Sequence, residues 1–189
     1  MLYVVAAGEE RTLVVKIDEV GIPVGGIFAD AAQIQDSVEN FCYKIGEGKR
    51  AQITPDFMII ARCESLIAGK SVDDAIERCL AYVKAGADGI MIHSKKKTGE
   101  DIKEFCQRFR KQEPSIPIVV VPTTYNHVTE DELASWGVNV VIYANHLLRA
   151  AYPAMVKCAE SILTHGRSLE ANDICMPIKD ILELIPGTK

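Results

Sequence analysis

The sequence predicts an α/β fold built on a parallel β-sheet, and two observations lead to this class. First, short apolar runs alternate with amphipathic stretches from residue 57 onward. Second, the runs are continuous and rich in β-branched residues, as expected for strands buried on both faces of a sheet. Strand and helix alternating at this pace form βα repeats, which make parallel sheets.

The expected strands are the apolar runs themselves. Four of them are FMIIARC (57–63), DGIMIH (88–93), IPIVVVP (116–122) and VNVVIYA (138–144). A fifth strand is expected at TLVVKI (12–17).

The stretches between these runs carry apolar residues at helical spacing. Helices are expected at 31–47, after Ser71, after Thr98, after Thr129, from 146 to 163 and from Pro177. The three hydroxyl residues each precede an acidic residue by three positions (Asp74, Asp101 and Glu132), which is the spacing of a capping box. Gly86, Gly137 and Gly166 stand where glycine commonly ends a helix.

These elements add up to five βα units, whereas a closed barrel needs eight and about 250 residues. The chain has 189 residues and shows no linker or low-complexity segment. We therefore expect a single domain over residues 1–189, short of a barrel by three units at its front.

Composition excludes several classes of function. The chain is 48% hydrophobic and 25% charged, with a net charge of −5, which argues against a nucleic-acid or membrane-surface partner. No apolar run reaches the roughly 18 residues that span a bilayer. The N-terminal residues do not resemble a signal peptide, so a cytoplasmic location is expected.

The six cysteines form no C-x-x-C pair. Four of them lie on the apolar stripes of expected helices: Cys42, Cys79, Cys106 and Cys158. The pattern favours reduced thiols packed as small apolar residues over a zinc site or disulfides.

Polar side chains suited to a small anion follow four successive expected strands. They are Arg62, His93, Thr123 with Thr124, and Asn145. In parallel α/β folds, functional residues lie at the carboxyl ends of the strands. Arginine offers a rigid fork for carboxylate or phosphate, and histidine donates a hydrogen bond to the same anion.

Each of these residues also has a purely structural interpretation. Glu64 lies two residues after Arg62, on the same side of the strand, and is a candidate ion-pair partner. A single histidine is more often a structural group, and Thr123 and Asn145 suit loop backbone. Four successive strands that end in such residues favour an anion site.

The stretch DFMIIARCESLIAGKSVDDAIERCLAYVKAGADGIMIHSKK (56–96) closely resembles the phosphoenolpyruvate mutase branch of the isocitrate lyase and phosphoenolpyruvate mutase superfamily. The likeness continues through VVVPTTYN (119–126), VVIYANHLLRAAY (140–152) and PIKDILELIPGTK (177–189). It covers residues 28–189, and residues 1–27 are divergent.

The resemblance implies the last five βα units of a (β/α)8 TIM-type barrel, without the first three strands. It implies an isomerase that interconverts phosphoenolpyruvate and phosphonopyruvate with Mg²⁺, acting as a homo-oligomer. Arg62 and His93 would bind the phosphoryl and carboxylate oxygens and stabilise the group in transit, while Thr123 and Asn145 would line the same rim.

The resemblance places the family's magnesium-holding aspartates and its serine-containing phosphate loop on the first three barrel strands, which are not found in this sequence. The fourth barrel strand of the family ends in Glu-Asp-Lys, and here Ile17, Asp18 and Glu19 stand at those places. Gly25 and Gly26 replace an Asn-Ser pair of the gating loop. We therefore expect no metal site in this chain and little turnover by the chain alone.

Three alternatives remain open at this point. In the first, the chain is a degenerate, non-catalytic paralogue that serves as an oligomer partner or anion-binding module. In the second, it is a relative of phosphonopyruvate hydrolase. A carbon–carbon lyase such as methylisocitrate lyase is disfavoured because its Lys-Lys-Cys-Gly-His string is missing. Exposed sheet edges lead us to expect association or aggregation of the isolated chain, unless its N-terminal segment caps an edge.

Overall fold

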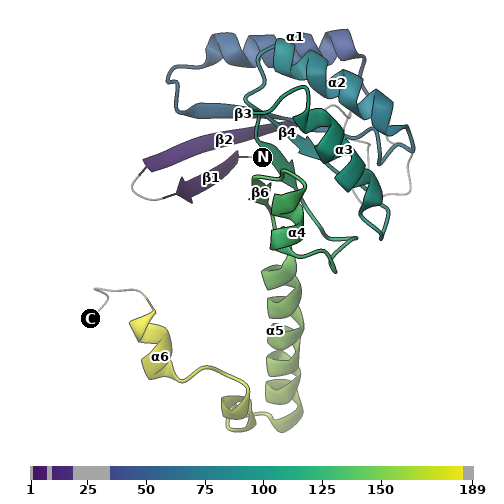
Figure 1. Ribbon diagram of the computed structural model, residues 1–189. Helices are drawn as coiled ribbons and strands as arrows, with labels where there is room; N and C mark the ends of the chain where they lie inside the picture. Colours follow the sequence, from purple (N-terminus) through teal and green to yellow (C-terminus); the bar gives the residue numbers. More distant parts are fainter. Residues whose placement is uncertain (1, 8–9, 19–34, 185–189) are drawn as a thin grey trace. The chain divides into compact units, whose positions relative to one another are not determined.

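A computed structural model describes residues 2–7, 10–18 and 35–184, with side-chain packing for 35–184. The chain divides into two compact units, Met1–Tyr143 and Ala144–Lys189. Among the described residues, the first unit holds the sheet and helices α1–α4, and the second is helical (Figure 1). No helix in the described part of the chain has the length and apolar character needed to cross a bilayer.

One six-stranded sheet forms the first unit, with its strands side by side in chain order. The strands are β1 (Leu2–Ala7), β2 (Glu10–Asp18), β3 (Phe57–Cys63), β4 (Gly89–Ile92), β5 (Ile118–Val120) and β6 (Val140–Val141). β1 pairs antiparallel with β2, and every later pair is parallel. The five expected strands are thus confirmed, and β1 is an additional strand at the edge next to β2.

Helices follow the parallel strands, as βα repeats require. In the first unit they are α1 (Val38–Ala51), α2 (Val72–Lys84), α3 (Glu100–Arg110) and α4 (Glu130–Ser135). The second unit contains α5 (His146–His165), the 3-10 helix η1 (Glu170–Asp173) and α6 (Ile178–Glu183).

Two helix starts differ from the prediction. α1 begins at Val38, where the Ser37 hydroxyl caps it by accepting from the Asn40 backbone N–H at 3.1 Å, and residues 31–34 of the predicted helix lie outside the described residues. α3 begins after Gly99, whose φ is 72°, and has no side-chain cap at Thr98. The Asp101 carboxylate accepts a hydrogen bond from Ser94 instead of completing the expected capping box.

The other predicted helix caps agree more closely with the structure. Thr129 and Glu132 form a complete capping box at α4. Ser71 accepts from the Asp74 backbone N–H at α2, but the Asp74 carboxylate turns to Ser65. Pro177 is the N-cap of α6 rather than its first helical residue.

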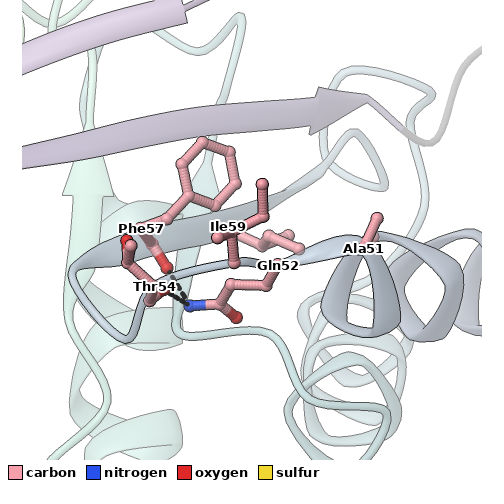
Figure 2. Close-up of a pocket in the computed structure, with 7 residues that line it drawn as sticks. Ala51, Gln52, Thr54, Phe57 and Ile59 are labelled. Carbon is pink, nitrogen blue, oxygen red and sulfur yellow. Dashed lines mark hydrogen bonds between the residues drawn. The ribbon is translucent and has the colours of Figure 1, made fainter.

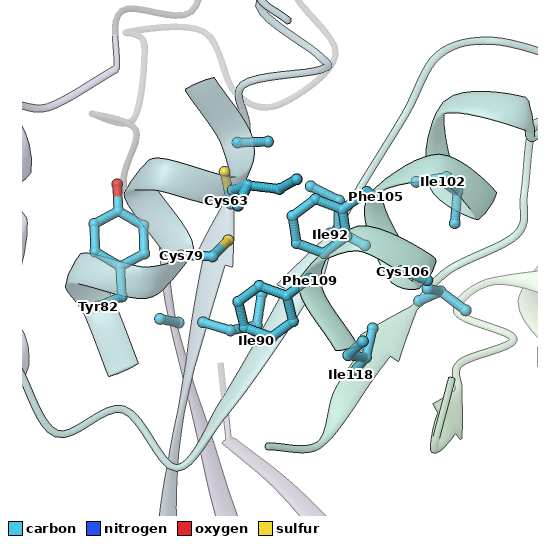
Figure 3. Close-up of a cluster of buried hydrophobic side chains, with 14 of the residues drawn as sticks. Cys63, Cys79, Tyr82, Ile90, Ile92, Ile102, Phe105, Cys106, Phe109 and Ile118 are labelled. Carbon is cyan, nitrogen blue, oxygen red and sulfur yellow. The ribbon is translucent and has the colours of Figure 1, made fainter. Parts of the chain in front are cut away.

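The main core lies between the sheet and helices α1–α4, where Figure 3 shows isoleucines of the strands facing Phe105 and Phe109 of α3. The two phenylalanine rings stack with centroids 5.3 Å apart. The opposite face of the sheet carries a smaller cluster made by Ile60, Met91 and Val119. Both faces of the central strands are therefore covered by apolar side chains, as their continuous apolar runs predicted.

Two loops at the amino ends of the strands are held together by the Arg110 side chain at the end of α3. Its guanidinium donates to the backbone carbonyls of Glu113, Pro114, Ile116 and Gly137 at 2.6–3.2 Å, and to the Asn139 side chain at 2.8 Å. Arginine suits this role because its donors form a fixed, permanently charged fork.

Replacing Arg110 with alanine should lower the free energy of unfolding by about 2–4 kcal/mol, since several loop carbonyls lose a charged donor. Arg108, on the same helix, provides the matched control. It makes only exposed ion pairs with Asp73 and Glu104, and such pairs are worth roughly 0–1 kcal/mol. Urea unfolding of both variants tests this, and equal losses would contradict the assigned role of Arg110.

Candidate anion-binding site

By the alternation of side chains along a strand, Arg62 of β3 and His93, directly after the neighbouring parallel strand β4, fall on the same face of the sheet. Side chains on a strand alternate between faces, and Ile60 and Met91 both belong to the cluster opposite the helices. Arg62 lies two residues after Ile60, and His93 lies two residues after Met91, so each follows its neighbour on that face. Arg62 pairs in register with Met91, which separates the Cα atoms of Arg62 and His93 by about 8 Å.

The Arg62 side chain is tied to a carboxylate. Its Nε donates to Glu64, whose side chain is 1% exposed, while the Arg62 side chain keeps 18% of its surface exposed. The ion pair anticipated as the structural interpretation of Arg62 is therefore present. It orients the guanidinium at the carboxyl end of β3 while leaving part of the side chain accessible.

His93 directly follows β4 and is half-buried, with its Nδ1 atom inside the protein. Beyond it, Ser94 is buried and connects three segments. Its hydroxyl donates to Asp101 at 2.7 Å and accepts from the Lys96 backbone N–H at 3.1 Å, and its carbonyl accepts from the Thr124 hydroxyl at 2.9 Å. These bonds fix the loop that carries His93 against α3 and against the loop after β5.

The sequence did not reveal this role for Ser94 and Asp101. Asp101 was interpreted as a helix-cap residue because it stands three positions after Thr98. Its carboxylate is only 5% exposed, and that burial depends on tertiary packing. The sequence offered one signal for this bond. It is a serine at the end of a strand, followed by an acidic residue in the first turn of the next helix.

Replacing Ser94 with alanine is expected to destabilise the first unit by about 1–2 kcal/mol, because Asp101 and the Lys96 N–H each lose a partner. Ser115, which is exposed in the loop before β5, is the control position and should tolerate alanine without measurable loss. Thermal unfolding followed by circular dichroism measures both. A Ser94→Ala variant as stable as the wild type would show that the loop is held by other contacts.

The remaining predicted site residues lie in different parts of the chain. Thr123 is half-buried after β5, and its N–H bonds the Val121 carbonyl at 2.8 Å. Asn145 is the N-cap of α5 in the second unit, so its place at the rim stays a prediction. The backbone of Asp18, the last residue of β2, pairs in register with Arg62. Glu19 and the Gly25–Gly26 pair lie outside the described residues.

The thiol and phenol buried near α3 are not candidates for the chemistry. Burial raises the pKa of Cys106 to about 12, so this thiol stays protonated at neutral pH. Burial also raises the pKa of Tyr125, with Cys106 and Asp101 adding to the shift. Both residues belong to the helix-side core, on the other face from Arg62 and His93.

A pocket of about 370 Å³ lies at the opposite, amino end of β3 (Figure 2). It is lined mainly by apolar groups, among them Ala51, Phe57 and Ile59. The Gln52 side chain beside it is occupied by the carbonyls of Thr54 and Phe57, at 2.8 and 2.6 Å. Because catalytic groups of parallel α/β folds lie at the carboxyl ends of strands, this pocket is distinct from the Arg62–His93 site.

Comparison with known proteins decides the family. The family model described as phosphoenolpyruvate phosphomutase matches residues 6–163. The chain belongs to this family. The match includes most of residues 1–27, which the sequence resemblance had left as divergent.

Curated and solved relatives agree with this assignment. The phosphoenolpyruvate phosphomutase of Streptomyces hygroscopicus is 37% identical over 167 residues, which are 88% of this chain and 52% of that protein. The crystal structure of the phosphoenolpyruvate phosphomutase from Streptomyces platensis subsp. rosaceus superposes with a TM-score of 0.82 and 40% identity, covering 90% of this chain and 58% of that one. The chain spans about half the length of the curated relatives it matches.

A second solved relative bears on the metal. Phosphonopyruvate hydrolase, in complex with oxalate and Mg²⁺, superposes with a TM-score of 0.77 and 35% identity over 90% of this chain and 58% of that one. Among the described residues of this chain, no three His, Cys, Asp or Glu side chains gather where they would hold a metal ion. The Glu64 carboxylate accepts from Arg62, and the Asp101 carboxylate accepts from Ser94.

Proposed function

We propose that this chain carries the substrate-anion part of a phosphoenolpyruvate phosphomutase site, which interconverts phosphoenolpyruvate and phosphonopyruvate. The observation that carries the proposal is that Arg62 and His93 project to one face from the carboxyl ends of neighbouring strands. Family membership supplies the substrate class.

In this proposal Arg62 binds the anionic oxygens and His93 donates a hydrogen bond to the same group. A phosphoryl group in transit carries its charge on peripheral oxygens, so fixed donors in a partly buried site stabilise it more than water does. The Glu64 carboxylate is the positioning partner of Arg62, and the Ser94–Asp101 pair holds the loop of His93. The family resemblance also assigns Thr123 and Asn145 to the rim of the site.

In the proposed architecture, β2–β6 are the last five strands of an eight-stranded (β/α) barrel. Support comes from the parallel order of these strands and from superposition on slightly more than half of a solved phosphomutase. In such a barrel the small cluster of Ile60, Met91 and Val119 would face the interior, which places Arg62 and His93 on the interior side of the rim. The proposed location of the protein is the cytoplasm.

Turnover tests the proposed reaction. Phosphonopyruvate with Mg²⁺ should be converted slowly or not at all by this chain alone, because Ile17 and Glu19 stand where the resembled family has a glutamate and a lysine. Phosphorus NMR separates the outcomes. A phosphoenolpyruvate signal identifies the mutase and inorganic phosphate identifies a hydrolase, which is the second candidate because the hydrolase structure is 35% identical. Rapid phosphoenolpyruvate formation would contradict the expectation of weak activity.

The chain is also proposed to form homo-oligomers. Large apolar side chains of the second unit are exposed: Leu147, Leu148, Tyr152, Leu163, Ile178 and Leu184. Large apolar side chains left exposed in such numbers are typical of surfaces that bind another protein chain. Multi-angle light scattering should therefore show a species larger than the 20.8 kDa monomer, and a stable monomer at micromolar concentration would contradict the proposal.

A further inference from the structure

Two cysteines of the second unit touch each other. Cys158 lies on α5 and Cys175 follows η1, and their Sγ atoms are 3.5 Å apart although 17 positions separate them in the chain. Cys158 is half-buried and Cys175 is exposed. The sequence pattern had placed Cys158 among core thiols, and the structure corrects that assignment.

The backbone between the two cysteines is organised to bring them together. α5 ends at Gly166, whose φ of 61° suits glycine, and the chain then turns back through η1. The Cys175 N–H bonds the Ala171 carbonyl at 3.0 Å, and Arg167 pairs with Glu170 at 2.5 Å. Since Ala171 is only 4% exposed, this turn is packed, and the sulfur contact does not depend on side-chain rotation alone.

The four other cysteines lie in the first unit in different surroundings. Cys63, Cys79 and Cys106 are buried, and the Cys42 thiol contacts the Ala81 carbonyl at 3.5 Å. Only the pair in the second unit combines a neighbouring sulfur with access to solvent, among the described contacts. Thiol–disulfide chemistry requires both, because a thiolate must reach an incoming disulfide and a second thiol must resolve the product.

We propose that Cys158 and Cys175 form a redox-active dithiol that closes to an intrachain disulfide by exchange with a low-molecular-weight disulfide such as oxidised glutathione. One cysteine thiolate attacks a glutathione sulfur and expels the first glutathione thiolate, which leaves a mixed disulfide. The second cysteine, as thiolate, attacks the protein sulfur of that mixed disulfide and expels the second glutathione. The two protein thiols lose two protons and two electrons, and the oxidant is reduced to two glutathione thiols.

The bond has a defined structural consequence. Sulfurs at 3.5 Å must approach to about 2.05 Å, which requires side-chain rotation and a small backbone movement. Closure ties residue 175 to α5 two positions before Pro177, the N-cap of α6. The hydrogen bond with Cys158 raises the pKa of Cys175.

Tryptic peptide mapping detects this disulfide directly. Cleavage after Lys157, Arg167 and Lys179 puts the two cysteines on separate peptides, 158–167 and 168–179. The native chain is incubated with excess oxidised glutathione, alkylated, and digested without reduction. The two peptides should be recovered joined by a disulfide, at least about tenfold more abundant than either peptide carrying glutathione. Recovery of both peptides alkylated, or mainly as glutathione adducts, would overturn the proposal.

Variants separate the pair from general thiol reactivity. Cys175→Ser should leave a stable glutathione adduct on Cys158, because the resolving thiol is gone. Cys42→Ser is the matched control and should form the 158–175 link as the wild type does. A link between two chains through Cys175, detected as a dimer on a non-reducing gel in place of the intrachain product, would also contradict the assignment.

Discussion

Replacing Arg62 with methionine is expected to lower the free energy of unfolding of the first unit by about 3 kcal/mol. Methionine keeps much of the volume of the side chain but removes the cation beside Glu64. The Glu64 side chain is 1% exposed, so its charge remains buried after the attraction to Arg62 is lost. Taking one partner from a buried ion pair is more destabilising than removing the whole pair.

A double-mutant cycle with Glu64→Gln measures this coupling directly. Glu64→Gln should be costly in the wild-type background and much less costly beside Arg62→Met, with an interaction energy of about 1.5–3 kcal/mol. Urea unfolding of the four proteins gives the value. An interaction energy near zero would show that the pair is not an energetic unit, and that Glu64 does not position Arg62.

Phe105→Ala should produce a second large loss, about 3–5 kcal/mol in the free energy of unfolding. Phe105 is 0% exposed on α3, stacks on Phe109 and faces the strand isoleucines (Figure 3). Alanine leaves a cavity in a core that helices and sheet share, so neighbouring side chains collapse only in part.

An aromatic residue on the surface provides the comparison. Tyr43 on α1 is 63% exposed, and its replacement by alanine should change stability by less than about 0.5 kcal/mol. Denaturant midpoints of the two variants test the assigned core. A Phe105→Ala protein as stable as Tyr43→Ala would mean that α3 does not pack on the sheet as described.

Local sequence patterns predicted which strands and helices are present better than they predicted the residues at which these begin and end. The apolar runs identified the strands because side chains of central strands are buried on both faces, as for Ile90 and Met91 of β4. The run 138–144 predicted seven residues of strand, but β6 pairs only at Val140 and Val141. Hydrophobicity shows which residues are buried, whereas strand length depends on the backbone of the neighbouring strand.

The site was predictable as far as it depends on strand ends. The alternation of side chains places Arg62 and His93 on one face once the strands are parallel, as the sequence predicted, and paired in the register that the structure gives. The Ser94–Asp101 bond was not predictable, because it joins a strand end to a helix that begins elsewhere than expected. The contact between Cys158 and Cys175 likewise depends on a turn at Gly166 whose path the sequence pattern does not specify.

The central claim is that Arg62 and His93 belong to one anion-binding site, and isothermal titration with phosphonopyruvate tests it most directly. We predict saturable binding to the wild type and at least about tenfold weaker binding to both Arg62→Lys, which loses the guanidinium fork, and His93→Asn. The exposed His127 is the matched control, and His127→Asn should bind as the wild type does. Absence of binding to the folded wild-type chain, or equal affinity in all four proteins, would contradict the claim.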